Sequence, residues 1–364
     1  MDIPFTRYRD WVIIPVKVND SRPLSFIFDT GAPIGVLAKA DNSISLSYSG
    51  TIPVAGSDPN KPRTVPLATD VTFTLGDVLI KNGVAAIGAA SEAIAGTDGI
   101  IGKYLLENAD ITIDWDRQLL MVHKPGQGPR DTNAMSIPLT LSPTGHVYTT
   151  VQVSRNGQSV TVKAIVDTGA KSVFSIDKSQ CATLLEREPV LKNFIVSHGA
   201  NGPQWGDMAR GEVGIGTDVL QHAPITFRES DGRSILARAG IHANIGLGIL
   251  DRYNLTFSLR EGRLYLTPRS NLRDPFVTNR TGIITKPGHE KKIEVAGVIP
   301  HSPAQAAGIT AGDFIVAIDG KKTDTLTPHD VFVELKAAGK STLQLTVDRA
   351  GQAKQITLTL KESI

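Results

Sequence analysis

The sequence has almost none of the features that mark a metal centre, a disulfide framework or a membrane anchor. One cysteine, Cys181, occurs in 364 residues, which excludes an internal disulfide and any site built from several cysteines, and we expect it to be a small packed residue. No stretch approaches about eighteen uninterrupted apolar residues, so we expect no membrane-spanning segment. The 38 basic and 36 acidic side chains nearly cancel, which gives no electrostatic footprint for nucleic acid or for a membrane surface.

The usual motifs of cofactor and metal chemistry are missing as well. The eight histidines are scattered without an HExxH pattern, and neither GxSxG nor a Walker loop occurs. We therefore expect no metal and no cofactor. The N-terminal residues MDIPFTRYRDW lack the basic-then-apolar profile of a signal peptide. Two compartments stay open: the cytoplasm, or the periplasm or cell envelope if a signal has been removed.

What the sequence does contain is glycine (34), proline (21) and many short β-branched runs. Examples are VIIPVKV from Val12, ADITIDW from Ala109 and VYTTVQV from Val147. Short alternating runs bounded by Gly, Pro, Asn or Asp are typical of strands in antiparallel sheets or barrels. We expect the first 270 residues to be mainly β.

The chain also contains an internal repeat. VKVNDSRPLSFIFDTGA (16–32) aligns with VQVSRNGQSVTVKAIVDTGA (151–170), which carries three extra residues in the hairpin turn. The segments that begin at Ile101 and Ile245 align without a gap. The repeat indicates two halves of one ancestral unit.

Two segments with linker composition divide the chain. HKPGQGPRDTN (123–133) lies between the repeats, and PRSNLRDPFVTNRTG (268–282) follows the second. This division predicts two pseudo-symmetric β-barrel lobes at 1–130 and 131–270, and a small α+β domain at 280–364.

In each repeat an apolar strand runs into an Asp-Thr-Gly-Ala sequence, at Asp29 and at Asp167. A single Asp-Thr-Gly triplet is equally well a simple turn. Two copies at the same place in a duplicated unit meet on the pseudo-two-fold axis, which brings the two carboxylates within a few ångströms. Such a pair shares a proton, so that one member can act as base toward a water while the other acts as acid toward a carbonyl oxygen.

With these motifs the first 268 residues resemble the aspartic proteases of the retropepsin and pepsin type, with both lobes in one chain. The resemblance implies that Asp29 and Asp167 are the catalytic pair of an aspartic endopeptidase. It implies that two threonines hydrogen-bond across the pair, that two glycines hold the carboxylates coplanar through their N–H groups, and that two apolar-Gly pairs pack beneath the loops. The supporting residues are Thr30, Gly31, Ala32, Thr168, Gly169, Ala170, Ile101, Gly102, Ile245 and Gly246.

Two departures from the family pattern are visible. Pepsin-like enzymes carry Ser or Thr where this chain has Ala32 and Ala170, as retropepsins do. Loss of that hydroxyl removes a hydrogen bond to the ionised carboxylate and raises the pKa of the pair, so we expect activity at a less acidic pH than that of pepsin. In the second lobe, Asn244 stands where the apolar-apolar-Gly signature has an apolar residue, whereas Ile100 keeps the pattern in the first.

Two glycine-rich segments take the positions of the hairpin flaps that cover the substrate in this family. They are residues 47–64 and 197–208, and Tyr48 and Trp205 within them are candidates for substrate contact. Plain surface loops with packed aromatic residues are the alternative.

The C-terminal part has the pattern of a compact α+β domain. Ser302 and Pro303 followed by Gly308 read as the N-cap, first residue and stop of a short helix. A strand then ends in an Asp-Gly turn at 319–320, a second helix starts at Pro328 with Thr327 as its cap, and two strands surround RAGQ (349–352).

The stretch SPAQAAGITAGDFIVAIDG (302–320) resembles bacterial PDZ domains of envelope proteases. PDZ domains bind an extended peptide as an added strand and often capture its C-terminal carboxylate on backbone N–H groups. The resemblance implies peptide or protein C-termini as partners, with Gly282, Ile283 and Ile284 as the binding loop and strand and His329 at the groove.

The sequence thus predicts an aspartic endopeptidase that acts on polypeptides and carries a PDZ domain. Two alternatives remain. In one, the lobes are catalytically idle and the chain is a peptide-binding scaffold that acts through its PDZ domain. In the other, the chain is a regulatory protease that its flaps or PDZ domain keep closed until a partner binds.

Overall fold

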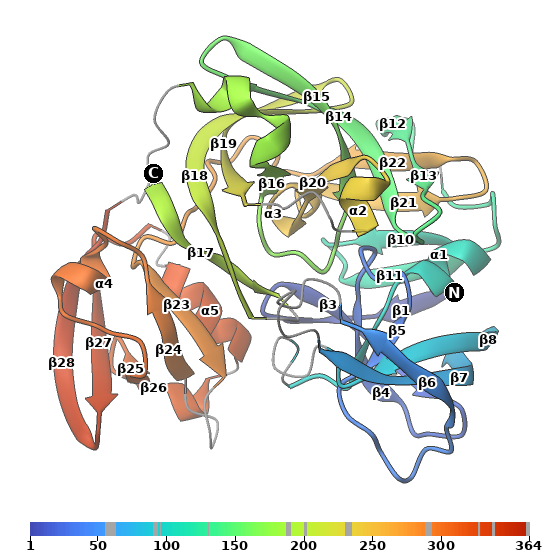
Figure 1. The fold of residues 1–364 in the computed structure, drawn as a ribbon, viewed down its shortest axis with the longest axis horizontal. Coiled ribbons are helices and arrows are strands. Elements are labelled where there is room, and N and C mark those ends of the chain that lie inside the picture. Colours follow the sequence, from blue (N-terminus) through green and yellow to red (C-terminus); the bar gives the residue numbers. More distant parts are fainter. Residues whose placement is uncertain are drawn as a thin grey trace.

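The computed structural model describes the chain except for residues 55–62, 90–93, 95, 130, 187–190, 200–201, 230–234, 288–292, 327, 337–338 and 362–364. The described part is mainly β, as expected, and is built from two barrels, a sheet that joins them and a smaller C-terminal domain (Figure 1). Within it, no helix has the length and apolar character needed to cross a membrane.

The first barrel is a sheet of the N-terminal repeat that closes on itself. Its order is β3-β4-β9-β5-β8-β7, and β7 pairs back to β3, with β2 and β6 appended at the ends. The strands are β2 (Thr6–Tyr8), β3 (Trp11–Val18), β4 (Leu24–Phe28), β5 (Gly35–Leu37), β6 (Ser47–Pro53), β7 (Thr64–Leu75), β8 (Val78–Ile87) and β9 (Gly99–Ile101).

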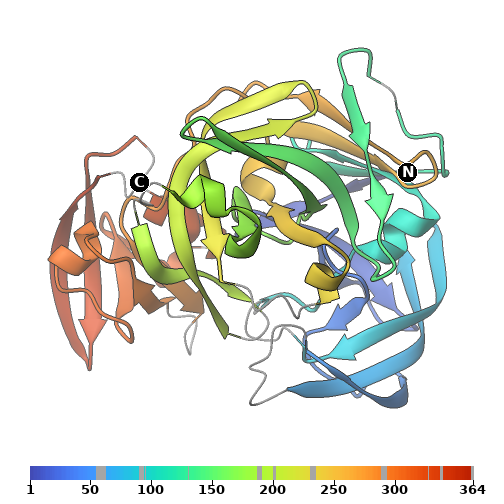
Figure 2. The ribbon, with the colours of Figure 1, turned by 45° about the horizontal axis from the view of Figure 1, so that its top comes forward.

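The second barrel repeats this order strand for strand as β14-β15-β20-β16-β19-β18, closed by β14 and β18, with β13 and β17 appended (Figure 2). The strands are β13 (Thr140–Leu141), β14 (Val147–Arg155), β15 (Gln158–Val166), β16 (Phe174–Asp177), β17 (Leu191–Gly199), β18 (Gly202–Ile215), β19 (Asp218–Arg228) and β20 (Ile241–Ile245). The identical order confirms the internal duplication that the sequence predicts.

Short helices follow the barrel strands at matching places. The helices of the two lobes are α1 (Lys103–Asn108), α2 (Ile235–Arg238) and α3 (Leu247–Leu250), with 3-10 turns η1 (Lys178–Gln180) and η2 (Ala182–Leu185). Helices α1 and α3 each start directly after the glycine of the apolar-Gly signature, Gly102 or Gly246.

A six-stranded sheet joins the two lobes in the order β1-β11-β10-β21-β22-β12. Its strands are β1 (Asp2–Pro4), β10 (Asp110–Asp114), β11 (Leu119–His123), β12 (Met135–Pro138), β21 (Tyr253–Ser258) and β22 (Arg263–Pro268). The central pair, β10 and β21, comes from different lobes and places Thr112 opposite Thr256, with their hydroxyls 2.8 Å apart. Buried side chains of both lobes form one continuous core around this sheet, which fixes the barrels relative to each other.

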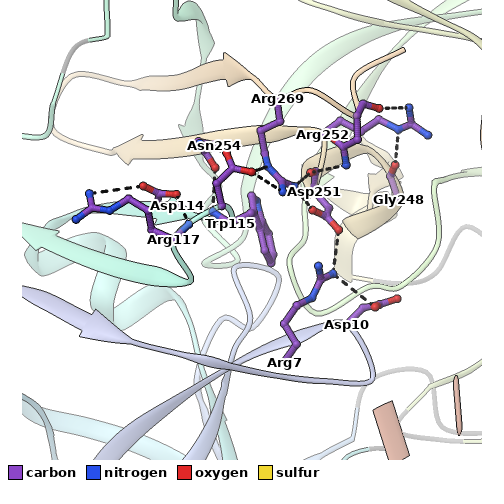
Figure 3. A network of polar contacts seen from close by, with 12 residues as sticks. Arg7, Asp10, Asp114, Trp115, Arg117, Gly248, Asp251, Arg252, Asn254 and Arg269 are labelled. Carbon is purple, nitrogen blue, oxygen red and sulfur yellow. Dashed lines mark hydrogen bonds and ion pairs between the residues drawn. The ribbon is translucent and has the colours of Figure 1, made fainter. Parts of the chain in front are cut away.

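Ion pairs on the surface also connect the lobes. Figure 3 shows Arg7 of the first lobe beside Asp251 of the second, with a nitrogen–oxygen distance of 2.9 Å. Arg269 contacts the same Asp251 and lies 2.8 Å from Asp116. The charges of four separate chain segments therefore meet at the rim of the joining sheet.

The C-terminal domain has a sheet and a hydrophobic core of its own. Its strand order is β23-β24-β25-β27-β28, with β26 paired to β25. The elements are β23 (Ile283–Pro287), β24 (Ile293–Val298), α4 (Pro303–Ala306), β25 (Phe314–Ile318), β26 (Lys321–Lys322), η4 (Thr323–Thr325), α5 (Pro328–Lys336), β27 (Thr342–Arg349) and β28 (Gln352–Thr359).

The predicted helix caps and turns of this domain are confirmed where the structure describes them. The Ser302 side chain accepts the Gln305 N–H at 3.3 Å, and Pro303 opens helix α4. Gly308 after the helix and Gly320 in the Asp-Gly turn have φ of +75° and +78°, the region that favours glycine. The expected cap Thr327 lies outside the described residues.

The C-terminal domain contacts both lobes. It lies beside the barrels next to β17 in Figure 1, where Leu191 of β17 and Ile299 are buried together. Met208 and Ile284 pack against this pair. In addition, Lys336 of α5 forms a 2.8 Å ion pair with Asp10 of the first lobe.

Candidate active site

The two Asp-Thr-Gly loops leave their barrels at equivalent points and meet between the lobes. Asp29 follows β4 and Asp167 follows β15, and both are half-buried. The backbone N–H of Asp29 donates to the Ile101 carbonyl at 2.9 Å, and that of Asp167 donates to the Ile245 carbonyl at 3.0 Å. Each aspartate is thus tied to the end of the strand parallel to its own.

Thr30 and Thr168 clamp the loops to each other. The Thr30 N–H donates to Thr168 Oγ1 at 3.0 Å, and the Thr168 N–H donates to Thr30 Oγ1 at 3.1 Å. Each hydroxyl then donates into the opposite lobe, Thr30 to the Val166 carbonyl and Thr168 to the Phe28 carbonyl at 2.7 Å. Because both threonines are buried, breaking one of these bonds would leave an unsatisfied polar group, so the network keeps the loops in register.

The carboxylates lie against the glycines of the opposite loops. Gly31 donates its N–H to Asp29 Oδ1, and Gly169 donates its N–H to Asp167 Oδ1, both at 2.8 Å. A Cβ atom on Gly31 would lie 2.6 Å from Asp167 Cγ, and one on Gly169 would lie 2.3 Å from Asp29 Cγ. Only glycine leaves this space, which lets the Asp167 side chain come close enough to raise the pKa of Asp29.

Burial and the partner charge determine the protonation of Asp29. Burial first, and the adjacent Asp167 second, raise the pKa of Asp29 well above its ordinary value, while the N–H groups of Gly31 and Ala32 oppose the rise. Burial and the neighbouring Asp167 side chain therefore both favour the protonated form of Asp29.

Glycines support the loops from below. A Cβ on Gly102 would lie 1.7 Å from the Asp29 carbonyl oxygen, and one on Gly246 would lie 2.2 Å from the Ser172 carbonyl oxygen. The preceding Ile101 and Ile245 are fully buried. Both apolar-Gly pairs thus pack directly against the loops.

The two aspartates differ in their surroundings. Asp167 Oδ1 accepts the Ala170 N–H at 2.9 Å in addition to that of Gly169. Its other oxygen, Oδ2, accepts the side-chain amide of Asn244. The sequence shows Asn244 only as a weakened apolar motif, and its contact with the carboxylate becomes visible only when the loop is folded.

Trp11 and His146 lie beside the two loops and were missed by sequence reasoning. Trp11 donates its indole N–H to the Gly169 carbonyl at 2.7 Å. The Asp167 carboxylate acts on the His146 ring, whose pKa is lowered by burial and raised less by that charge. A signal was present, because alignment of Val16 with Val151 places Trp11 opposite His146.

Lys171, directly after the second loop, is also unexpected. Its Nζ lies 4.5 Å from the centre of the Trp11 ring, a cation–π distance. Burial, and then the nearby Arg9, lower the pKa of Lys171 to about 7. This lysine, with its lowered pKa, therefore lies beside the tryptophan that donates to the second Asp-Thr-Gly loop.

The candidate flap residues lie on strand pairs. Tyr48 is in β6, which pairs with β7, and Trp205 is in β18, which pairs with β17. Both aromatic side chains are exposed, at 53% and 49%, which leaves them available for contact with another molecule. Residues 55–62 and 200–201 of these segments lie outside the described residues.

The candidate peptide-binding residues of the C-terminal domain form a closed local network. Asn279 Oδ1 accepts the Gly282 N–H at 2.9 Å, and Thr281 Oγ1 accepts the Ile283 N–H at 3.2 Å. Ile283 is buried, and Ile284 is half-buried against β17 and β18. His329 belongs to α5, but its side chain lies outside the described part.

Cys181 and possible metal ligands were the other candidates for a chemical centre in the described residues. Cys181 is buried as expected, and burial raises the pKa of its thiol to about 12. Within the described ranges, no three His, Cys, Asp or Glu side chains gather in a way that could hold a metal ion.

Comparisons with known proteins agree with this geometry. A family model described as a PDZ domain matches residues 294–349. The crystal structure of an aspartic proteinase from Irpex lacteus superimposes on 76% of this chain and 99% of that chain with a TM-score of 0.50, at 14% sequence identity. No curated protein sequence matches the chain. The chain therefore combines the two-barrel fold of a pepsin-like aspartic proteinase with a C-terminal PDZ domain.

Proposed function

We propose that the chain is an aspartic endopeptidase and that Asp29 and Asp167 are its catalytic pair. The observation that carries this proposal is the closeness of the two aspartates: each carboxylate is held by an N–H group of its own loop against the glycine of the other loop, and Asp167 acts on the pKa of Asp29. A merely structural pair of turns has no need for two adjacent, half-buried acids, whose mutual repulsion costs stability.

The two aspartates have unequal surroundings, and we infer from this difference which of them acts as the base and which as the acid. Asp167, which accepts three N–H groups, is the ionised base, and Asp29, whose pKa is raised, is the acid. A water between them loses a proton to Asp167 as its oxygen attacks the scissile carbonyl carbon, while Asp29 protonates the carbonyl oxygen. The resulting tetrahedral diol collapses as Asp167 gives its proton to the leaving nitrogen and Asp29 takes a proton from a diol hydroxyl, so the pair returns to its starting state and no covalent intermediate forms.

The rest of the chain supplies positioning in this proposal. The Thr30–Thr168 clamp and the apolar-Gly pairs keep the carboxylates in place, because small displacements of reacting groups cost rate. The hairpins that carry Tyr48 and Trp205 cover an extended polypeptide between the lobes 1–130 and 131–270. The PDZ domain at 280–364 binds peptide or protein C-termini through Gly282, Ile283, Ile284 and His329 and brings substrates to the lobes.

The test is the cleavage of a peptide library between pH 3 and pH 8. The wild type is compared with the active-site variants Asp29→Asn and Asp167→Asn. The control variant is Asp20→Asn, because Asp20 is exposed. We expect the wild type and the control to cleave, each active-site variant to lose at least about a thousandfold in kcat/KM, and pepstatin to inhibit.

Two outcomes would contradict the proposal. Full activity in either active-site variant would exclude a shared pair. A wild type that cuts nothing, but binds C-terminal peptides, would favour the scaffold.

A further inference from the structure

Asn244 and Ile100 occupy matching positions of the two lobes but have opposite chemistry. Each lies on the strand that runs parallel to the one carrying the aspartate: Ile100 is opposite Ile27, and Asn244 is opposite Ile165. Ile100 is buried and apolar. The amide of Asn244 instead reaches the carboxylate of Asp167.

The Asn244 contact makes the hydrogen bonding of the pair asymmetric. Its Nδ2 donates to Asp167 Oδ2, while the N–H groups of Gly169 and Ala170 donate to Oδ1, so both oxygens of Asp167 accept bonds from fixed N–H donors. At the mirror position, the hydrocarbon side chain of Ile100 has no group that could donate a hydrogen bond to Asp29. An amide N–H can only donate, and therefore it stabilises the ionised carboxylate over the protonated one.

This arrangement carries a cost that an apolar residue would avoid. The Oδ1 atom of Asn244 is buried, and within the described part of the chain it accepts no hydrogen bond. A buried acceptor without a donor loses its hydration without compensation. Since an isoleucine fills the mirror position without this loss, the amide is explained by its bond to Asp167 rather than by packing.

We propose that Asn244 is a positioning residue that holds Asp167 in the ionised state and thereby keeps the shared proton on Asp29. The inference rests on the proposed protease function and refines it, since it makes the two halves of the pair unequal before substrate binds. In this way Asn244 supplies the hydrogen bond that a hydroxyl at Ala170 would otherwise give.

The other charged groups near Asp167 do not provide this bias. Asp29 faces it directly and repels a second negative charge. Burial lowers the pKa of His146 and so favours its neutral form. The charge of Lys171 interacts with Arg9, Asp10 and Lys336, and its Nζ lies over the Trp11 ring. Asn244 is therefore the group whose removal isolates the effect.

The test is the pH profile of kcat/KM for Asn244→Leu, with Ile100→Leu as the mirror control. In Asn244→Leu we expect the acidic limb of the profile to move up by about one pH unit, which corresponds to a roughly tenfold loss of kcat/KM at pH values below that limb. In Ile100→Leu we expect both the acidic and the basic limb to keep their positions. Adding Ala170→Ser to Asn244→Leu should move the limb back, because a hydroxyl there lies next to the oxygen that accepts the Ala170 N–H. Asn244→Ala, which only removes atoms, replaces the leucine variant if that variant does not fold.

A second readout does not depend on catalysis. Aspartate carboxyl carbons are labelled with ¹³C and titrated by NMR, and Asp29→Asn and Asp167→Asn assign the pair. We expect the first carboxyl to ionise to be that of Asp167, and its titration to shift upward in Asn244→Leu. An unshifted titration overturns the inference about Asn244 even if the protein is an active protease. A shifted titration in a protein that cleaves nothing supports the inference and rejects the protease function instead.

Discussion

In the proposed mechanism Asp29 acts as the protonated member of the pair, so its pKa sets the upper limit of the pH range in which the pair works. Activity ends at high pH where Asp29 loses its proton, and burial together with Asp167 raises the pKa of Asp29. We therefore predict that the basic limb of the pH–rate profile lies at higher pH than an ordinary carboxyl would give, and that the enzyme works at a less acidic pH than pepsin. A profile that peaks only near pH 2 would contradict this.

The same residue should make the stability of the protein depend on pH. A carboxyl whose pKa is raised by folding contributes stability that is complete below its unfolded pKa of about 4 and is lost as the pH rises through its folded pKa. We predict that Asp29→Asn melts a few degrees above the wild type at pH 7 and that this gain disappears near pH 4. Thermal unfolding at both pH values measures it, with Asp20→Asn expected to show no such difference.

Lys171 should have the opposite dependence on pH. Folding lowers the pKa of Lys171 to about 7, so its contribution to stability is complete above its unfolded pKa of about 10.4 and is lost as the pH falls toward 7. We predict that Lys171→Met weakens the dependence of the melting temperature on pH between 7 and 10. The matched control is Lys17→Met, because Lys17 is exposed. Equal curves for Lys171→Met and the wild type would contradict the expectation.

At this scale the sequence shows residue types but not the contacts that give them a role. The paired Asp-Thr-Gly triplets were recognisable because the chain repeats them. The donation of Asn244 to Asp167 and of Trp11 to Gly169 depends on how separate strands are brought together. Such contacts follow from tertiary packing, which no local pattern encodes.

At the scale of single elements, the close packing of helix α1 under the first loop gives a sharp test. A Cβ atom on residue 102 would lie only 1.7 Å from the Asp29 carbonyl oxygen. We predict that Gly102→Ala displaces the loop, costs about 1–3 kcal/mol and abolishes cleavage. Urea unfolding and peptide hydrolysis measure the two effects. Gly214→Ala is the control, because a Cβ there would approach Gln152 no closer than 3.5 Å.

Elements governed by local chemistry were predictable, whereas their order in space was not. The cap at Ser302 and the Asp-Gly turn at 319–320 were foreseen because they depend on neighbouring residues. The insertion of β16 between β19 and β20, and the joining of β10 to β21, link residues far apart in the chain. The repeat indicated matching lobes, but strand order requires the non-local pairings themselves.

At the scale of the whole molecule, the PDZ domain is held against the lobes by a small apolar cluster. Ile299 is buried against Leu191 at the base of the β17–β18 hairpin, and Lys336 adds an ion pair with Asp10. We predict that Ile299→Asp releases the domain and increases proteolytic cleavage in the linker 268–282. Lys336→Ala should have a smaller effect, because a partly exposed ion pair contributes about 0–1 kcal/mol. Identical digestion of Ile299→Asp and the wild type would show that the cluster does not hold the domain.

This docking links the two candidate binding regions of the chain. Ile284, on the strand expected to receive a peptide, belongs to the same cluster as Met208 of the second hairpin. The composition of the linker predicted a separate domain. It did not predict this contact, because the contact depends on how surfaces from distant parts of the chain pack together. A peptide added beside β23 would therefore lie next to the base of the hairpin that covers the proposed cleft.

The seam between β10 and β21 gives the molecule the character of a dimer fused into one chain. Each half contributes three strands to the joining sheet, and the hydroxyls of Thr112 and Thr256 face each other across its centre. Such a contact is isologous, so either half alone would expose a strand edge that is complementary to itself. The two halves, produced as separate polypeptides, should accordingly bind to each other. Joining them in one chain favours the pair of one N-terminal and one C-terminal half over pairs of identical halves. Of these combinations, it is the one that places Asn244 beside just one of the two aspartates.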